Sequence, residues 1–179
     1  AVRPEHLLAV YELDEPLDAT NASSYEVGRT GLTSAAPPTR SSVAVEGHAY
    51  YFGGSAWLDT PVLPLAPLES PQLTMGAWVY PQSRFEAHDG VRAVLTLDDA
   101  QGHAARALAI DAGRWVAFAG SGGVLAGPPV RPFEWAFVAV VYDQAARTVA
   151  LHIDGETTSG EAFMRAGRRS LRIGARGGA

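Results

Sequence analysis

The acidic residues whose spacing could support catalysis lie near the start of the chain, in the stretch YELDEPLDATN (residues 11–21). On a β-strand, residues i, i+2 and i+4 share one face, so Glu12 and Asp14 would point the same way. A retaining glycosidase needs two carboxyl groups about 5 Å apart across the bond that it cleaves. Pro16 occupies the third position of such a set, and Glu15 points to the opposite face. The trio is incomplete, so we interpret it as the polar end of a strand and not as an active site.

Tryptophan and histidine are the other residue types that could contact a ligand. Trp78 and Trp135 sit inside apolar runs, which predicts that both are core anchors. Trp57 and Trp115 lie near the ends of expected strands. Core packing is the favoured interpretation for both, and a platform for a sugar ring at the rim is the alternative. His152 could face a groove, although a hydrogen-bonded surface histidine is the default expectation.

Several other chemistries find no support in the sequence. The chain has no Cys, its five His residues show no metal-binding spacing, and no Gly-x-Ser-x-Gly motif is present. The GSGG stretch (120–123) lacks the Lys and the following helix that a phosphate-binding loop needs. Four Arg between residues 165 and 172 could grip an acidic partner, but a solvated loop is the favoured interpretation.

Composition narrows the possible partners further. The net charge is -5, and all 14 basic residues are Arg, so the sequence gives no sign of a nucleic-acid-binding surface. No apolar run is long enough to span a membrane. The 179 residues suffice for one domain with a substantial core, and we expect a single domain over 1–179, as a module or fragment of a larger protein.

The elements that must position these residues are short strands. Runs rich in β-branched and aromatic residues recur between Gly, Pro, Asp and Asn, and helix-like periodicity is poor, which predicts an all-β sandwich or barrel. The expected strands are 6–13, 42–46, 48–52, 56–61, 73–81, 91–99, 105–111, 114–120, 134–143, 147–155 and 170–175. Proline-rich 60–72 is expected to cross over a sheet edge, and 83–90 and 119–132 are expected to be loops.

Alternation and turn residues add detail to three of these elements. Val149, Leu151 and Ile153 share one face, which predicts a strand with one side in the core. The run 135–142 is apolar on both sides and is expected to be central and covered on both faces. Residues 142–147 predict a hairpin turn, and DAGR (111–114) and IDGE (153–156) are further tight-turn candidates.

The order of these pieces resembles the laminin-G-like, concanavalin A-like jelly-roll family. The matching motifs are YELDE, GHAYYFGGSAWLDTP, LTMGAWVYP, EWAFVAVVYD, VALHIDGE and LRIGA, in sequence order. The resemblance implies two antiparallel sheets, one concave and one convex. Laminarinase-like relatives place a Glu-x-Asp-x-(x)-Glu set on the first strand, and Pro16 and Leu17 replace its last Glu here.

The resemblance also implies two features that this chain shows only in part. A loop after the first strand binds Ca²⁺ in relatives, which makes Asp18 and Asn21 candidate ligands, with a metal-free Asx turn as the favoured alternative. Rim-loop acids, the pairs Asp98–Asp99 and Glu86–Asp89, are weaker candidates for the same ion. Relatives also carry a closing strand after LRIGA, which is not seen before Ala179. A partner segment, or a neighbouring part of a longer parent chain, is therefore expected to complete the sheet edge near residues 7–13.

The sequence therefore predicts a non-catalytic module that binds a glycan or a protein through rim loops or the concave sheet. The alternative is a structural domain of a larger complex, docked through its open sheet edge, and a glycoside hydrolase or lyase is a third reading. The resemblance favours an extracellular or cell-surface location, and an intracellular assembly stays open.

Overall fold

The computed structural model describes residues 13, 38–53, 55–59, 72–99, 104–120, 123–163 and 167–174, with the backbone alone at 98–99, 104–105 and 167–170. These residues form 12 strands and a three-residue 3₁₀ helix, η2 (Ala87–Asp89). The strands are β1 (Thr39–Ser41), β2 (Ala49–Tyr51), β3 (Leu58–Asp59), β4 (Gln72–Val79), β5 (Arg92–Asp99), β6 (Ala104–Asp111), β7 (Arg114–Phe118), β8 (Val124–Pro129), β9 (Ala136–Asp143), β10 (Thr148–Ile153), β11 (Glu156–Glu161) and β12 (Gly167–Ile173).

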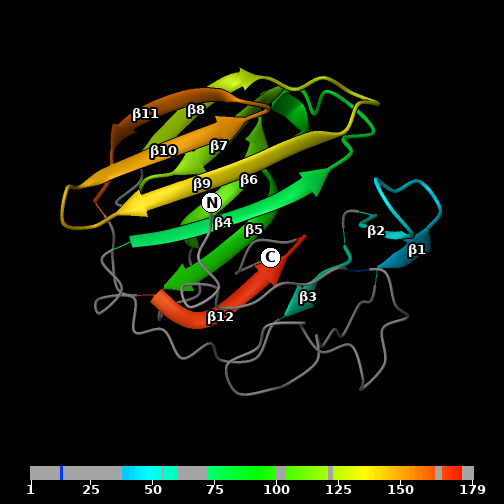
Figure 1. Ribbon diagram of the computed structural model, residues 1–179, viewed down its shortest axis with the longest axis horizontal. Helices are drawn as coiled ribbons and strands as arrows, with labels where there is room; N and C mark the ends of the chain where they lie inside the picture. Colours follow the sequence, from blue (N-terminus) through cyan, green and yellow to red (C-terminus); the bar gives the residue numbers. More distant parts are fainter. Residues whose placement is uncertain are drawn as a thin grey trace.

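The strands build two facing antiparallel layers (Figure 1). One is a four-stranded sheet in the order β11-β10-β9-β4, and the other is a six-stranded sheet in the order β3-β12-β5-β6-β7-β8. The small β1–β2 hairpin stands apart at one end. The predicted antiparallel β-sandwich is therefore confirmed.

The core lies between the two sheets and follows the alternation of the strands. In β10, Val149, Leu151 and Ile153 are buried as predicted, and they face Trp115 and Leu108 of the other layer within one apolar cluster. β9 is central, as predicted, because it pairs with β10 on one side and β4 on the other. Its outer face is only partly covered, which corrects the expectation that both faces are buried.

The predicted tight turns are present, and two of them have left-handed residues at both central positions. Ala112 and Gly113 have φ values of 46° and 73°, and Asp154 and Gly155 have values of 47° and 91°. Turns of this kind match the twist of a two-stranded ribbon. The second joins β10 to β11 and places Asp154 beside β9.

Three strand predictions were wrong. Residues 42–46 form no strand but the loop of the β1–β2 hairpin, where Val43 and Val45 are exposed. The expected loop 119–132 contains β8, a strand at the sheet margin that tolerates Pro128 and Pro129 because it pairs only with β7 among the described strands. β11 was missed because its sequence, ETTSGE, is polar and pairs along one side of β10.

The two layers approach closely where β8 faces β10. A Cβ atom added at Gly127 would lie 2.6 Å from Cδ2 of Leu151, so only glycine fits there without movement. The guanidinium Nε of Arg114 donates to the Gly127 carbonyl at 2.9 Å and ties β7 to β8 beside this contact.

A buried polar group crosses the core at the other end of the sandwich. The Tyr142 hydroxyl on β9 donates to the Phe118 carbonyl at 2.7 Å and accepts from the Ala107 amide at 3.1 Å. The Arg106 guanidinium lies 5.9 Å from the Tyr142 ring centroid. Burial raises the pKa of Tyr142 well above its ordinary value and lowers the pKa of Arg106.

The outer faces of the two sheets differ in exposure. On the six-stranded sheet, the outward residues Thr96, Ala107, Ala109 and Val116 are buried. On the four-stranded sheet, the outward residues of β4 are exposed and alternate with inward residues that are buried or half-buried. Trp78 is one of the exposed residues. The accessible sheet surface is therefore the outer face of β4, β9, β10 and β11.

Some expectations fall outside the described residues. These are the acidic stretch at Glu12, Asp14 and Glu15, the crossover at 60–71 and the sheet edge near residues 7–12. Leu13 is described and packs against the core. Within the described part of the chain, no helix is long and apolar enough to cross a membrane.

Candidate functional site on the outer face of the four-stranded sheet

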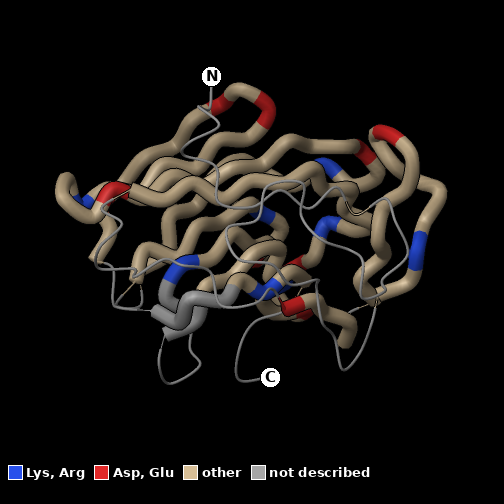
Figure 2. The backbone as a smooth tube through the Cα atoms, turned by 60° about the horizontal axis from the view of Figure 1, so that its bottom comes forward, with Lys and Arg blue, Asp and Glu red and all other residues tan. Residues whose placement is uncertain are grey.

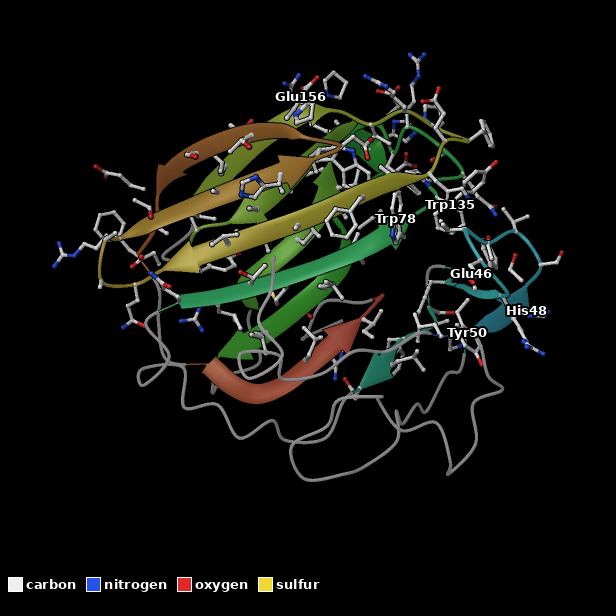
Figure 3. All side chains as sticks on the ribbon, in the orientation of Figure 1. Glu46, His48, Tyr50, Trp78, Trp135 and Glu156 are labelled. Carbon is white, nitrogen blue, oxygen red and sulfur yellow. The ribbon has the colours of Figure 1, made fainter. Side chains whose placement is uncertain are left out.

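Four aromatic side chains gather where β4 ends and β9 begins. Trp78 pairs with Phe137 across the two strands, with ring centroids 5.4 Å apart and planes tilted by 60°. One step further along the same face, Tyr80 and Trp135 have centroids 5.4 Å apart and a tilt of 48°. Figure 3 shows Trp78 and Trp135 at this end of the sheet, toward the β1–β2 hairpin. We call Trp78, Tyr80, Trp135 and Phe137 the aromatic end.

The aromatic end is open to solvent. The Trp78 and Phe137 side chains are 54% and 44% exposed, and Tyr80 and Trp135 are half-buried. Offset and tilted ring pairs of this kind hold each other in place and keep a broad apolar surface accessible. Large exposed aromatic groups that are held by neighbours are typical of interaction surfaces.

The neighbouring row of the face is made of small residues. Gly76 lies opposite Ala139, and a Cβ atom at Gly76 would meet the Ala139 Cβ at 3.2 Å and the Phe137 ring at 3.5 Å. The Phe137 ring therefore leans over the glycine, in the diagonal direction that aromatic side chains reach across strands. The surface beside the two exposed rings is low, because no side chain rises from Gly76.

The same row ends in a polar pair on β10 and β11. His152 lies opposite Ala139 on one side and Thr157 on the other, and its Nδ1 is 2.8 Å from the Thr157 hydroxyl. That hydrogen bond fixes the ring, so Nε2 is the nitrogen left to meet a ligand. From β4 to β10 is two strand spacings, or about 10 Å. The exposed rings and the His152–Thr157 pair thus flank the Gly76–Ala139 floor.

Asp154 holds the aromatic end in position. Its carboxylate Oδ1 accepts from the Phe137 amide at 2.8 Å, and its own amide donates to the Phe137 carbonyl at 3.0 Å. The β10–β11 turn is thereby clamped to the residue that carries one of the two exposed rings. This clamp also brings a carboxylate to the border of the face.

The far end of the face is polar. Asp143 accepts from the Gln72 side chain at 2.8 Å and from the Ala146 amide at 2.8 Å. Both hydrogen bonds lower the pKa of Asp143, and the hydrogen bond from Ala146 has the larger effect. Thr148 separates Asp143 from Glu161 in the same row.

The predicted ligand-binding residues lie in three separate places. Trp115 is 1% exposed and packs in the core, so its alternative role as a rim platform is wrong. Trp57 is partly exposed beside β3, where the Arg172 guanidinium lies 5.8 Å from its ring centroid and also binds Asp59 at 2.7 Å. His152 faces the accessible surface, and its role in ligand binding stays a prediction.

The prediction that Trp78 is a core anchor was wrong, and Trp135 is only half-buried. The alternation of β4 could have corrected it, because Trp78 shares parity with Gln72, Thr74 and Gly76 and not with the buried Met75. Trp135 could not be placed in this way, since β9 is apolar at both parities.

The predicted metal ligands are not placed by the structure. Asp18 and Asn21 lie outside the described residues, as do the side chains of Asp98 and Asp99. Asp89 lies 3.7 Å from the His88 ring nitrogen. Within the described residues, no three His, Cys, Asp or Glu side chains are grouped to hold a metal ion. Calcium binding at Asp18 and Asn21 stays a prediction.

Several solved structures share this arrangement of strands. The mouse laminin alpha1 chain, domains LG4-5, matches with a TM-score of 0.55 at 12% identity, over 75% of this chain and 39% of that one. The receptor binding domain of botulinum neurotoxin mosaic serotype C/D gives a TM-score of 0.61 at 12% identity, over 87% and 40%. The receptor binding domain of botulinum neurotoxin type G gives a TM-score of 0.53 at 10% identity, over 84% of this chain and 41% of that one. These likenesses establish the fold.

The chain spans about two fifths of the length of these structures. No curated protein matches its sequence significantly. A family model described as the concanavalin A-like lectin/glucanases superfamily, in its laminin G form, matches residues 52–179, which include both sheets. The chain therefore belongs to the concanavalin A-like lectin/glucanase superfamily, as its motifs predict.

Proposed function

We propose that the protein is a non-catalytic carbohydrate-binding module that holds a sugar ring against Trp78 and Phe137. The observation that carries the proposal is the exposure of Trp78, which is 54% accessible on the outer face of β4. A pyranose ring offers an apolar C–H face and a rim of hydroxyls. An aromatic plate beside a few polar groups complements both parts.

The surroundings of Trp78 supply the second part of such a site. The low floor at Gly76 and Ala139 gives a ring room to lie beside Trp78, and Nε2 of His152 and the Thr157 hydroxyl are positioned to meet its hydroxyl groups. Membership in a superfamily of lectins and glucanases fits a carbohydrate ligand. The laminin and neurotoxin receptor-binding structures share the fold and are consistent with a binding role.

The carboxylates of the face do not suit acid catalysis. A glycosidase needs a general acid whose pKa is raised, so that it carries a proton at working pH. Asp143 has the opposite property, because its hydrogen bonds lower its pKa. Asp154 has one carboxylate oxygen occupied by the Phe137 amide. The partners of Asp143 therefore favour its ionised form, and this supports binding without bond cleavage.

A glycan array followed by calorimetric titration tests the proposal. Trp78→Ala should lower the affinity for the best array ligand at least about tenfold, because the loss of a stacking plate removes on the order of 1.4 kcal/mol. Trp78→Phe should retain part of the affinity. Phe163→Ala is the matched control, since Phe163 is 53% exposed but follows the opposite end of β11. Unchanged binding by Trp78→Ala, or no binding to any arrayed glycan, would overturn the proposal.

A second candidate function is assembly into a larger complex through a sheet edge. The uncharged margin formed by β4 is the observation that favours it. Among the described strands, β4 pairs only with β9, and its eight residues contain neither a charge nor a proline. Uncharged edges of this kind are able to pair with another strand. Slow amide exchange along β4 only when a partner is present would support assembly, whereas exchange unaffected by candidate partners would count against it.

A further inference from the structure

The arginines of the two large sheets all lie on the six-stranded sheet. The strands β4, β9, β10 and β11 contain no Arg, and the chain has no Lys. The strands β5, β6, β7 and β12 all contain Arg. Figure 2 shows the basic positions along the chain in blue and the acidic ones in red. The accessible face that carries the aromatic end therefore has no permanent positive charge on its strands.

Carboxylates border the same face at both ends. Asp154 is exposed next to Phe137, and Asp143 and Glu161 lie in the last row, about 20 Å away along the strands. Hydrogen bonds keep Asp143 ionised. His152 is the one titratable side chain between these borders among the described residues of the face, and its Nδ1 is engaged by Thr157. Two described arginines lie close in sequence to the strands of the face. Arg147 is in the β9–β10 turn at its polar end, and Arg131, four residues before Trp135, is paired with Glu134 at 3.9 Å.

We infer that this face selects uncharged glycans and rejects sialylated, sulfated or uronic acid-containing ones, with Asp143, Asp154 and Glu161 as the specificity-determining residues. The inference rests on the proposed function. An anionic group beside Trp78 would lie nearest to the Asp154 carboxylate, and the strands of the face offer no guanidinium to neutralise it. Arg131, which precedes Trp135 by four residues, is already paired with Glu134 at 3.9 Å. Neutral sugars avoid this cost and keep the same ring stacking. The discrimination therefore arises from repulsion and leaves the contacts to the neutral part of the ligand unchanged.

The size of the effect follows from Coulomb's law. A single like charge about 8 Å away costs about 0.5 kcal/mol in water, before salt screens it. One close carboxylate and two more distant ones should then give the neutral member of a matched pair roughly fivefold tighter binding in low salt. The Debye length falls from about 30 Å at 0.01 M to about 3 Å at 1 M, so high salt should bring the ratio near one.

Matched pairs of glycans provide the test. The probes are lactose with 3′-sialyllactose and with 3′-sulfolactose, together with the other neutral and charged pairs of the array, titrated against the wild-type chain at low and high salt. We expect the neutral member to bind more tightly in each pair that binds at all, with a ratio that shrinks as salt rises. A charged member that binds more tightly, or a ratio independent of salt, would overturn the inference.

Two charge variants separate a local effect from that of the net charge. Asp143→Asn, Asp154→Asn and Glu161→Gln together should bring the ratio to within about twofold of one. The control combines Glu86→Gln, Asp89→Asn and Asp111→Asn, which change the net charge by the same amount. Glu86 and Asp89 lie in the loop 83–90, and Asp111 ends β6 on the six-stranded sheet. The control should keep most of the preference, and equal effects of the two variants would contradict the assignment.

The outcomes also separate this inference from the proposed function. If Trp78→Ala weakens binding but charged glycans bind best, the selectivity is wrong and the site stands. If Trp78→Ala leaves every pair unchanged, the site itself is wrong, and the selectivity falls with it.

Discussion

The Tyr142 hydroxyl on β9 donates a hydrogen bond to the Phe118 carbonyl on β7 at 2.7 Å, and so joins the two sheets through the core. The same oxygen accepts from the Ala107 amide on β6. One side chain of the four-stranded sheet thus provides hydrogen bonds to two strands of the six-stranded sheet.

Tyr142→Phe should destabilise the fold by about 1–3 kcal/mol, because it leaves a buried amide and a buried carbonyl without the hydroxyl. Urea unfolding followed by circular dichroism measures the change. Tyr51→Phe is the control, since Tyr51 is 47% exposed on β2 and should unfold like the wild type. An unchanged midpoint for Tyr142→Phe would mean that the hydroxyl contributes nothing to stability.

The stability advantage of the wild type over Tyr142→Phe should shrink at alkaline pH. Burial raises the pKa of Tyr142 in the folded state, while the unfolded side chain titrates near the ordinary tyrosine pKa of 10.0. The unfolded state therefore loses its proton first, and the free energy of unfolding falls as pH rises, by up to about 1.4 kcal/mol per unit. Unfolding curves of both proteins between about pH 9 and pH 11 measure this. A constant difference over that range would contradict the burial of the hydroxyl.

The tryptophans should differ sharply in their contribution to stability. Trp115→Ala should cost about 3–5 kcal/mol, because Trp115 is 1% exposed in the core. Trp78→Ala should change the free energy of unfolding by no more than about 1 kcal/mol, because its ring is half in solvent. Thermal and urea unfolding of both variants would show the contrast, and similar losses for the two would contradict this placement of the rings.

Gly127→Ala should be destabilising by about 1–3 kcal/mol, because the new methyl group would press on Leu151 at the closest approach of the two sheets. Gly123→Ala is the matched control on the same side of the sandwich. Its added Cβ would meet only ordinary contacts at 3.6 Å and 3.8 Å, so its unfolding midpoint should stay close to that of the wild type. Equal unfolding midpoints for the two variants would show that the contact between position 127 and Leu151 can relax to accept a methyl group.

Asp154→Ala should cost about 1 kcal/mol and speed amide exchange at Phe137, because it removes the acceptor of that amide. Asp154→Asn should retain both properties, since an amide oxygen accepts the same hydrogen bond and Asn tolerates the left-handed backbone at φ 47°. Hydrogen exchange read by NMR distinguishes the variants. Fast exchange at Phe137 in Asp154→Asn as well would assign the clamp to the charge and not to the hydrogen bond.

The sequence was sufficient for the sandwich because burial follows alternation wherever one face is apolar and the other polar. β10 is the clearest case, with Val149, Leu151 and Ile153 buried as predicted. The same logic applied to β4 would have placed Trp78 outside, but the size and apolarity of the ring suggested a core position instead. Parity was therefore a better guide to Trp78 than side-chain hydrophobicity.

The candidate site was less predictable because it is assembled across strands. Trp78 and Phe137 are 59 positions apart in sequence (137 − 78), and only the pairing of β4 with β9 makes them neighbours. Trp115 was ambiguous for a different reason, since both Trp115 and the adjacent Val116 are buried and alternation gives no direction. Domain organisation over 1–179 and the Ca²⁺ ligands stay predictions.

Pro128 and Pro129 follow each other at the end of β8, and neither has an amide hydrogen to donate. Whichever side each nitrogen faces, the pair leaves two successive positions of β8 without a donor for a neighbouring strand. A second chain aligned along β8 would find the hydrogen-bond ladder broken there, which hinders the growth of this sheet into a fibril. The described part of the chain is built mainly of strands, and the proline pair lowers the risk of templated aggregation along β8.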